Sequence, residues 1–289
     1  MSNKSDKPVL SKKRDSVGMK ILVYAVCIFF ALLSITPFYI MIVNSTRSTA
    51  QIQHHAVSFI PGTNLKFNWD VFEGKSFNVG TGFKNSAIIA VSSTVLNMYF
   101  SSLTAYALTV YEWKLRDAFF KLIMGIMMIP AQVTTIGFYT MCYKLHLTNN
   151  LLMLILPSIA APMTVFFLRQ YLQASLQISI VESARIDGAG EFSIFNRIVL
   201  PIMKPAIATQ AIFAFVGSWN NLFMPMILLT NTENYTMPIM VGLLNGDIYR
   251  TEHGAIYLGL TLTVLPLIIV YLLLSKYIVE GVAVGGVKE

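Results

Sequence analysis

The sequence has little charge for its length. Only 12% of its 289 residues are charged and 55% are hydrophobic, whereas soluble domains carry about 25% charged residues. A net charge of +7 is often seen in nucleic-acid-binding proteins. Here, however, the basic residues stand at the ends of apolar runs and do not gather on one soluble face. The composition therefore favours a lipid membrane as the environment and excludes nucleic acid as a partner.

Patterns typical of disulfides, metal sites and nucleotide sites are also missing. The two cysteines, Cys27 and Cys142, lie far apart in apolar runs, which favours two buried free thiols over a disulfide. The neighbouring His54 and His55 point in different directions in a helix or a strand, so we predict no metal site. No Gly-x4-Gly-Lys-Ser/Thr loop is present. We therefore expect no cofactor in this chain, no ATPase site of its own and no enzyme activity.

Long apolar runs dominate what is present. A bilayer core requires about 20 mostly apolar residues per helix. Six stretches approach or exceed this length, and they are residues 21–43, 86–110, 118–142, 151–168, 206–230 and 255–275. The first is too long for the apolar part of a secretory signal and lacks a small-residue cleavage site, so we interpret it as a retained anchor. The sequence predicts an all-α membrane protein with six transmembrane helices.

Lys and Arg are distributed unevenly between the two ends of these runs. Fifteen of the 21 fall in the N-terminal tail, the connections after the second and fourth runs, and the C-terminal tail. The positive-inside rule makes that side cytoplasmic, with both termini inside. The predicted organisation is a cytoplasmic tail 1–20, a six-span domain 21–279 and a cytoplasmic tail 280–289. The external loops are 44–85 and 231–254, and the long internal loop is 170–205.

The predicted spans contain almost no ionisable side chain away from their ends. Carriers coupled to protons or sodium usually keep such a group inside the bundle. The polar residues within the spans are neutral: Thr94, Asn97, Gln132, Thr134, Thr135, Asn220 and Asn221. A neutral, hydrogen-bonding path suits a hydroxyl-rich solute. For each of these residues, hydrogen bonding between helices is the alternative interpretation.

The internal loop 170–205 has the pattern of two short helices. Ser179 and Glu182 fit a capping box, which predicts a helix of about two turns over 181–187. Gly188 or Gly190 then ends this helix in a left-handed conformation. A second amphipathic helix follows and is limited by Pro201. Its apolar stripe consists of Phe192, Phe195, Ile198 and Val199.

The spacing of residues in this loop is more specific than its helical pattern. Glu182-Ser183-Ala184 is followed by three residues and Gly188, then nine residues and Ile198, then one residue and Leu200-Pro201. This spacing resembles the EAA signature of importer permeases in the ABC transporter superfamily, which reads E-A-A-x3-G-x9-I-x-L-P. Ser183 departs from the signature by replacing one small residue with another. Asp187 before Gly188 also fits the common form.

Two further segments resemble the carbohydrate branch of that family, as represented by the shorter membrane subunit of maltose transporters. These are Trp219-Asn220-Asn221 in the fifth run and the tail from Glu280 to Lys288. Asn221 stands where the family usually has an acidic residue. The resemblance implies a sugar path through this subunit, for which the candidate residues are Asn97, Gln132, Trp219, Asn220 and Asn221.

The resemblance also implies partners. Two ATP-binding subunits, which hold ATP and Mg, are expected to dock on a coupling helix between the fourth and fifth transmembrane helices. The coupling residues would be Glu182, Ser183, Ala184, Asp187, Gly188, Ile198, Leu200 and Pro201. A second homologous permease subunit completes the membrane part. An external solute-binding protein would deliver a sugar, with Tyr235, Asn245 and Tyr249 as candidate contacts. An ordinary solvated loop is the alternative interpretation of this segment. The location would be a bacterial or archaeal plasma membrane.

Other functions compete with this interpretation. An ion-coupled secondary carrier is disfavoured by the lack of intramembrane charge and by the loop spacing. A polytopic membrane enzyme would require a clustered acid, base or metal site near a span end, and the sequence offers none. Within the importer interpretation, a phosphorylated polyol or another small solute remains an alternative to a sugar or oligosaccharide.

Overall fold

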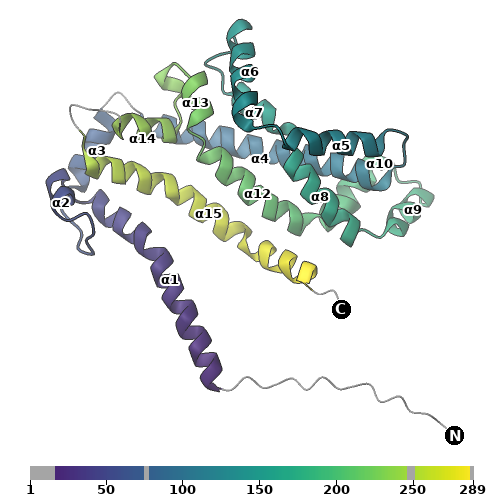
Figure 1. The fold of residues 1–289 in the computed structure, drawn as a ribbon, viewed down its shortest axis with the longest axis horizontal. Coiled ribbons are helices and arrows are strands. Elements are labelled where there is room, and N and C mark those ends of the chain that lie inside the picture. Colours follow the sequence, from purple (N-terminus) through teal and green to yellow (C-terminus); the bar gives the residue numbers. More distant parts are fainter. Residues whose placement is uncertain (1–16, 75–77, 246–250, 287–289) are drawn as a thin grey trace.

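The computed structural model describes residues 17–74, 78–245 and 251–286, and within these ranges the chain forms helices and no strand (Figure 1). The elements are α1 (Val17–Ser45), α2 (Thr49–His54), α3 (Leu65–Gly74), α4 (Val79–Val110), α5 (Arg116–Met127), α6 (Ala131–Lys144), α7 (Leu152–Ile155), η1 (Leu156–Ala160), α8 (Pro162–Ser175), α9 (Ile178–Ile186), α10 (Glu191–Ile194), η2 (Phe195–Val199), α11 (Leu200–Ile202), α12 (Lys204–Trp219), α13 (Phe223–Leu228), η3 (Thr232–Asn234), α14 (Met237–Asn245) and α15 (His253–Gly286).

Among the described residues, four helical stretches are long and apolar enough to cross a membrane. They are Val17–Ser45, Val79–Val110, Leu152–Ser175 and His253–Ser275. Each corresponds to a predicted span. The second begins seven residues earlier than the predicted 86, because Asn78 caps α4 by accepting a hydrogen bond from the Thr81 backbone N–H. For these four stretches the prediction of helical segments long and apolar enough to span a membrane is confirmed.

The remaining two predicted spans do not form helical stretches of this length. The run 118–142 is divided into α5 and α6 by a break that includes Pro130, a residue without an N–H group to continue the helix. In the run 206–230, α12 ends at Trp219 and α13 begins at Phe223. The segment Glu191–Ile202 meets Lys204–Trp219 at a bend of 79°, and this pair adds a fifth crossing if it forms one span. The single-helix prediction was wrong in both runs.

The bundle is formed by α4, α8, α12 and α15. The long helix α4 packs against α8 and α12, and α15 packs against α12, α1, α3 and α14 (Figure 1). Ala90, Phe215 and Trp219 form a buried cluster where α4 and α12 meet. A larger cluster joins the C-terminal half of α4 to α8 and to the segment from α9 through Met203. The internal loop is therefore part of the packed structure.

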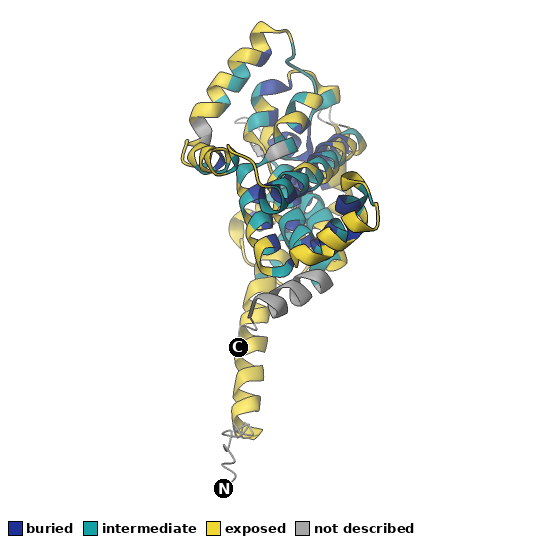
Figure 2. Cartoon of the chain, turned by 90° about the vertical axis from the view of Figure 1, so that its right-hand side faces the viewer, coloured by how far each residue is buried: buried dark blue, intermediate teal, exposed yellow. Residues whose placement is uncertain are grey.

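The helix α1 leaves the bundle and exposes most of its length (Figure 2). Phe29 is 62% exposed and Leu32 is 63% exposed. Apolar side chains at this density favour lipid or another subunit over water as their surroundings. Cys27 also lies on this exposed helix, so its predicted burial was wrong, whereas Cys142 is buried; both are free thiols.

The segment 44–85, whose structure the sequence left open, is organised by two buried polar side chains. Arg47 donates to the Asn44 side chain at 2.9 Å and to the backbone carbonyls of His55 and Gln51 at 2.8 and 2.9 Å. Asn68 on α3 donates to the carbonyls of Ser45 and Arg47. These hydrogen bonds fasten α2 and α3 to the end of α1.

Candidate functional site

The first part of the candidate site is α9, which has two chemically different faces. Val181 and Ala184 are buried in the cluster shared with α4 and α8. Glu182, Ser183 and Asp187 are exposed. The helix begins at Ile178, and its N-cap is Gln177 without a side-chain hydrogen bond. The predicted capping box was therefore wrong, because Ser179 lies inside the helix and not at its start.

Gly188 ends this helical segment in a left-handed conformation, as the sequence predicted. Its φ is +80°, and the next residue, Ala189, donates from its backbone N–H to the Ala184 carbonyl at 3.0 Å. Gly190 has a φ of −69° and serves as the N-cap of α10. A Cβ atom built on Gly188 would meet nothing within 4 Å. The requirement for glycine is thus conformational, and the space around it stays open for a partner.

The second part of the loop is a helical segment that anchors α9 to the bundle. Ile194, Phe195 and Val199 are fully buried, whereas Phe192, predicted to share their stripe, is 69% exposed. The prediction assumed one α-helical period across this segment, whereas Phe195–Val199 forms the π-helical turn η2. Ile198 and Leu200 are partly buried against the same cluster.

The predicted coupling residues therefore fall into two groups. Glu182, Ser183, Asp187, Gly188 and Pro201 are exposed. The others, Ala184, Ile198 and Leu200, pack into or against the core. The sequence spacing thus specifies both an accessible surface and the apolar contacts beneath it.

A carboxylate that the sequence analysis missed connects α9, α10 and the end of α4. Glu191 accepts hydrogen bonds from Arg185 Nε at 2.6 Å, from the Tyr106 hydroxyl at 3.0 Å and from the Tyr111 hydroxyl. The guanidinium carbon of Arg185 also lies 5.4 Å from the centre of the Tyr111 ring. The hydrogen bond from Arg185, followed by that from Tyr111, lowers the pKa of Glu191 to about 2. We call these four side chains the carboxylate clamp.

A cavity of about 330 Å³ lies between α4, the α7–η1 segment and the α12–α13 break. Its lining brings together two predicted path residues, Asn97 and Asn221. The other residues that line it are Ser93, Met153, Leu154, Pro157, Ser158, Ala214, Gly217, Ser218 and Met224. The Ser93 hydroxyl is buried and has no hydrogen-bond partner. The cavity thus offers neutral hydrogen-bonding groups and has no ionisable side chain in its lining.

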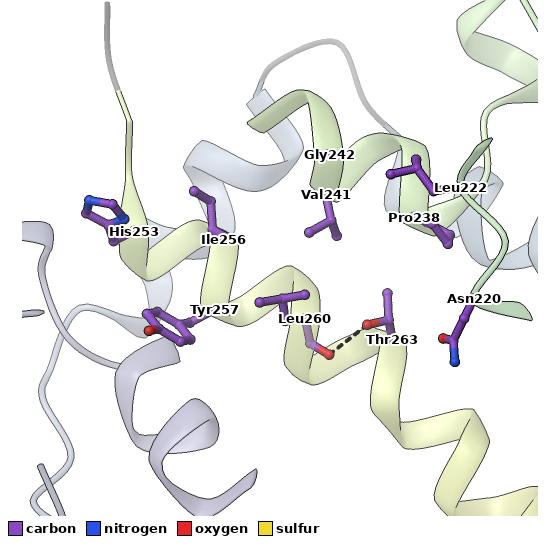
Figure 3. Close-up of a pocket in the computed structure, with 10 residues that line it drawn as sticks. All are labelled: Asn220, Leu222, Pro238, Val241, Gly242, His253, Ile256, Tyr257, Leu260 and Thr263. Carbon is purple, nitrogen blue, oxygen red and sulfur yellow. Dashed lines mark hydrogen bonds between the residues drawn. The ribbon is translucent and has the colours of Figure 1, made fainter. Parts of the chain in front are cut away.

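Asn220 lines a different cavity, of about 520 Å³, between α12, α14 and α15 (Figure 3). Figure 3 shows Asn220 and His253 at opposite ends of this cavity, with Val241 and Leu260 between them. The two adjacent asparagines therefore contribute to separate spaces. The side chain of Gln132, also a predicted path residue, lies outside the described residues.

Trp219 is 2% exposed and belongs to the packed interior. Its indole N–H donates to the Thr263 carbonyl at 2.9 Å, and its ring stacks on Phe215 at 5.7 Å between centroids. These contacts hold the end of α12 against α15. Trp219 lines neither of the two cavities, so any effect on a solute would pass through the position of Asn220 and Asn221.

The external loop 231–254 is partly described. Tyr235 is half-buried, and the Asn85 side chain on α4 donates to its carbonyl at 3.0 Å and to the Glu233 carbonyl at 2.8 Å. The side chain of Asn245 and all of Tyr249 lie outside the described residues. These hydrogen bonds therefore hold the segment around Tyr235, a candidate contact for a solute-binding protein, against α4.

Comparisons with known proteins agree on one family. Residues 97–284 match the family described as "Binding-protein-dependent transport system inner membrane component". The Arabinooligosaccharides transport system permease protein AraQ of Bacillus subtilis (strain 168) is 34% identical over 286 residues, which cover 95% of this chain and 99% of that protein. The Lactose transport system permease protein LacG of Rhizobium radiobacter is 31% identical over 93% of this chain and 96% of its own.

The fold also matches a solved structure. A chain from the crystal structure of a bacterial ABC transporter involved in the import of the acidic polysaccharide alginate superposes with a TM-score of 0.76. The match covers 94% of this chain and 100% of that chain, at 23% sequence identity. At this sequence identity the match shows that the two chains share a fold and nothing further.

Proposed function

This chain belongs to the family of inner membrane components of binding-protein-dependent transport systems, and from that premise we propose that it is the permease subunit of an ABC importer that translocates a sugar or oligosaccharide. The observation that carries the proposal is the two-faced helix α9. Its exposed residues Glu182, Ser183 and Asp187 are available to another subunit, while Val181 and Ala184 are buried in the bundle. A force on the exposed face is therefore transmitted to the membrane helices.

In this proposal α9 is the coupling helix, and it docks into a cleft of an ATP-binding subunit. Two such subunits hold ATP and Mg, and this chain contributes no residue to their chemistry. Their closure on ATP moves α9 and shifts the bundle from an inward-facing to an outward-facing state, and hydrolysis resets it. Glu182 and Asp187 offer carboxylates to a basic rim of the ATP-binding subunit. Gly188 allows close approach because no side chain covers its open space.

The proposed topology has six crossings with both termini in the cytoplasm of a bacterial or archaeal cell. The segment α5–α6 forms the third crossing around the break at Pro130, and α12–α13 forms the fifth around its own break. Broken membrane helices are tolerated where neighbouring helices satisfy the freed backbone groups. The excess of Lys and Arg in the internal segments supports this orientation.

A sugar fits the cavity that contains Asn97 and Asn221. Its polar lining, Ser93, Ser158, Ser218 and the two asparagines, offers donors and acceptors without charge. Discontinuous helices border such sites in other transporters, and here both η1 and the α12–α13 break do so. The names of the relatives, which include arabino-oligosaccharide and lactose permeases, support the same substrate class. A second permease subunit would contribute the other wall, and an external binding protein would deliver the sugar to loop 231–254.

The direct test is purification of the tagged chain from its native membrane in a mild detergent. An ATP-binding subunit and a second permease chain are expected to co-purify. Glu182→Ala and Gly188→Trp are expected to lose the ATP-binding subunit. Gly188→Asn is the matched control for backbone strain, because asparagine tolerates positive φ better than other side chains. Glu112→Gln is the control for removal of an exposed carboxylate.

Uptake into vesicles that contain the purified complex tests the substrate class. Arabinotriose, lactose and raffinose are the probes, with sorbitol 6-phosphate as the phosphorylated polyol. ATP-dependent uptake of at least one sugar is expected. Uptake that persists without ATP and collapses with the ion gradient would instead identify a secondary carrier, and purification of the chain alone under every mild condition would contradict the importer assembly.

A further inference from the structure

The carboxylate clamp joins parts of the chain that lie far apart in sequence. Tyr106 and Tyr111 are separated from Glu191 by 85 and 80 residues, yet both donate to Glu191 Oε2. Arg185 donates to the other oxygen, Oε1. Both carboxylate oxygens are therefore engaged, and the groups that hold them come from α9 and from the end of α4.

Aromatic packing reinforces the same connection. The centroids of the Tyr106 and Phe195 rings are 5.6 Å apart. Tyr99 lies two turns earlier on α4, and its ring centroid is 5.7 Å from that of Phe195. The Tyr99 hydroxyl also donates to Asn196 Oδ1 at 3.3 Å. Tyr106 itself is 2% exposed. The loop therefore contacts α4 over several helical turns and not at a single residue.

Tyr106 of the clamp and the α4 residues of the candidate sugar cavity belong to one uninterrupted helix, which has 32 residues in all. Ser93 and Asn97 line that cavity, and Ser93 lies about 20 Å from Tyr106 at the rise of an α-helix. The alternative route from the loop to the cavity runs through η2, α11 and α12. That route contains a π-helical turn and the 79° bend, features that concentrate flexing. The helix α4 is the stiffer connection.

We propose that Glu191, Arg185, Tyr106 and Tyr111 are positioning residues that transmit the movement of α9 to α4, and hence to the sugar cavity. This inference rests on the proposed function. Apolar contacts between α9 and α4 are non-directional and allow the two surfaces to slide. The hydrogen bonds of the clamp are directional, and those to a charged carboxylate are stronger than neutral ones. They fix the angle between the two helices as the loop moves.

The test reports on α4 directly and needs no knowledge of the sugar. Ser93→Cys places a reporter thiol on α4 in the cavity, in a Cys27→Ser/Cys142→Ser background, so that the reporter is the one thiol of this chain. The whole complex is purified with its ATP-binding subunits. The rate at which a small charged methanethiosulfonate reagent labels the thiol is then measured in two conditions. One is without nucleotide, and the other is after trapping with ATP and vanadate. Nucleotide binding is measured separately on the same preparation.

In the otherwise native complex, trapping is expected to change the labelling rate of the reporter. Glu191→Gln, and separately the double variant Tyr106→Phe/Tyr111→Phe, are expected to reduce this change by roughly threefold to tenfold. Both should still retain the ATP-binding subunits and bind nucleotide. Glu112→Gln and Tyr143→Phe, matched substitutions at exposed sites, are expected to leave the response unchanged.

Three results would overturn the inference: a full response in both variants, a reporter on α4 that never responds, or loss of the ATP-binding subunits from both variants. The last result would mean that the clamp only folds the docking loop. Failure of the proposed function looks different, because the unmodified complex would then contain no ATP-binding subunit at all.

Discussion

The indole N–H of Trp219 donates to the backbone carbonyl of Thr263 at 2.9 Å, which joins the last residue of α12 to the first third of α15. The chain leaves the helix immediately afterwards, and Asn220 and Asn221 enter two different cavities. This hydrogen bond therefore fixes the point at which the linings of the two cavities diverge.

Trp219→Phe is expected to lower stability by about 1 kcal/mol, because it removes the donor but keeps the stacking on Phe215. Trp219→Ala should cost about 3–5 kcal/mol through loss of the buried ring. The midpoint of thermal unfolding in detergent measures both. Trp113→Phe is the control, since that side chain is 43% exposed. Equal shifts at the two positions would show that Trp219 has no special packing role.

Gly254 lies against the polar cluster that holds α2 and α3. A Cβ atom there would lie 2.4 Å from the Arg47 carbonyl oxygen and from Asn68 Nδ2. Gly254→Ala is expected to lower stability by about 1–3 kcal/mol, because the first of these neighbours is backbone and cannot move aside easily.

Gly242→Ala is the matched control for that substitution. The nearest atom to its Cβ would be Leu222 Cδ1 at 3.6 Å, an ordinary contact. Alanine within α14 should be neutral or stabilising by up to about 1 kcal/mol. Thermal unfolding of the two variants side by side measures the difference, and a larger loss at Gly242 would contradict the packing described for Gly254.

The clamp predicts a defined pH dependence for the internal loop. The pKa of Glu191 falls from 4.5 to about 2, chiefly because Arg185 donates to it. Because the carboxyl pKa is lower in the folded loop, ionised Glu191 stabilises that loop fully when the pH is above the pKa of the unfolded chain. This stabilisation is lost as the pH falls toward 2. The effect is modest, because both side chains are more than a third exposed.

Hydrogen exchange over residues 178–199, corrected for intrinsic rates, measures this dependence. The contribution of Glu191 to protection in the native chain is expected to be constant from about pH 8 to 5. It is expected to decline below pH 4.5. Glu191→Gln should show lower protection at neutral pH and a weaker decline below it, whereas Glu112→Gln should follow the native curve. Identical curves for native and Glu191→Gln would exclude an ionised Glu191 in the clamp.

Asn97 and Asn221 are predicted to act on the same solute. Asn97→Ala and Asn221→Ala should each lower ATP-dependent sugar uptake by roughly threefold to tenfold, the value of one or two lost hydrogen bonds. The ATP-binding subunits should still co-purify. Ser92→Ala on the same helix, outside the cavity lining, is the control. An equal loss in Ser92→Ala and Asn97→Ala would point to a general defect of α4 and not to solute contact.

Much of the candidate site could be predicted from the sequence because its signals are local. The helix α9, the positive φ of Gly188 and the exposed positions Glu182 and Asp187 lie within a dozen residues of one another. Their spacing reflects backbone geometry over one or two turns. The capping box failed for the same local reason, since Ser179 and Glu182 fit the pattern while the helix begins at Ile178.

The rest could not be predicted because it depends on distant contacts. Proline inside an apolar run is compatible with a kink or with a break, and neighbouring helices decide between them. Pro37 and Pro266 lie inside continuous helices, whereas Pro130 lies at a break. The stripe at Phe192 was misassigned because the prediction assumed one α-helical period, whereas Phe195–Val199 is π-helical and Ile194 is buried in place of Phe192.

The sequence alone indicated the membrane environment and predicted the orientation by charge and the position of a coupling loop, because hydropathy, charge bias and motif spacing are properties of contiguous residues. The tertiary structure alone decided that Tyr106 and Tyr111 donate to Glu191, that Asn97 and Asn221 line one cavity, and that Asn220 lines another. These arrangements depend on how α4 packs against α12 and the internal loop. No short segment encodes that packing, because it follows from the shape and volume of side chains brought together from across the whole chain.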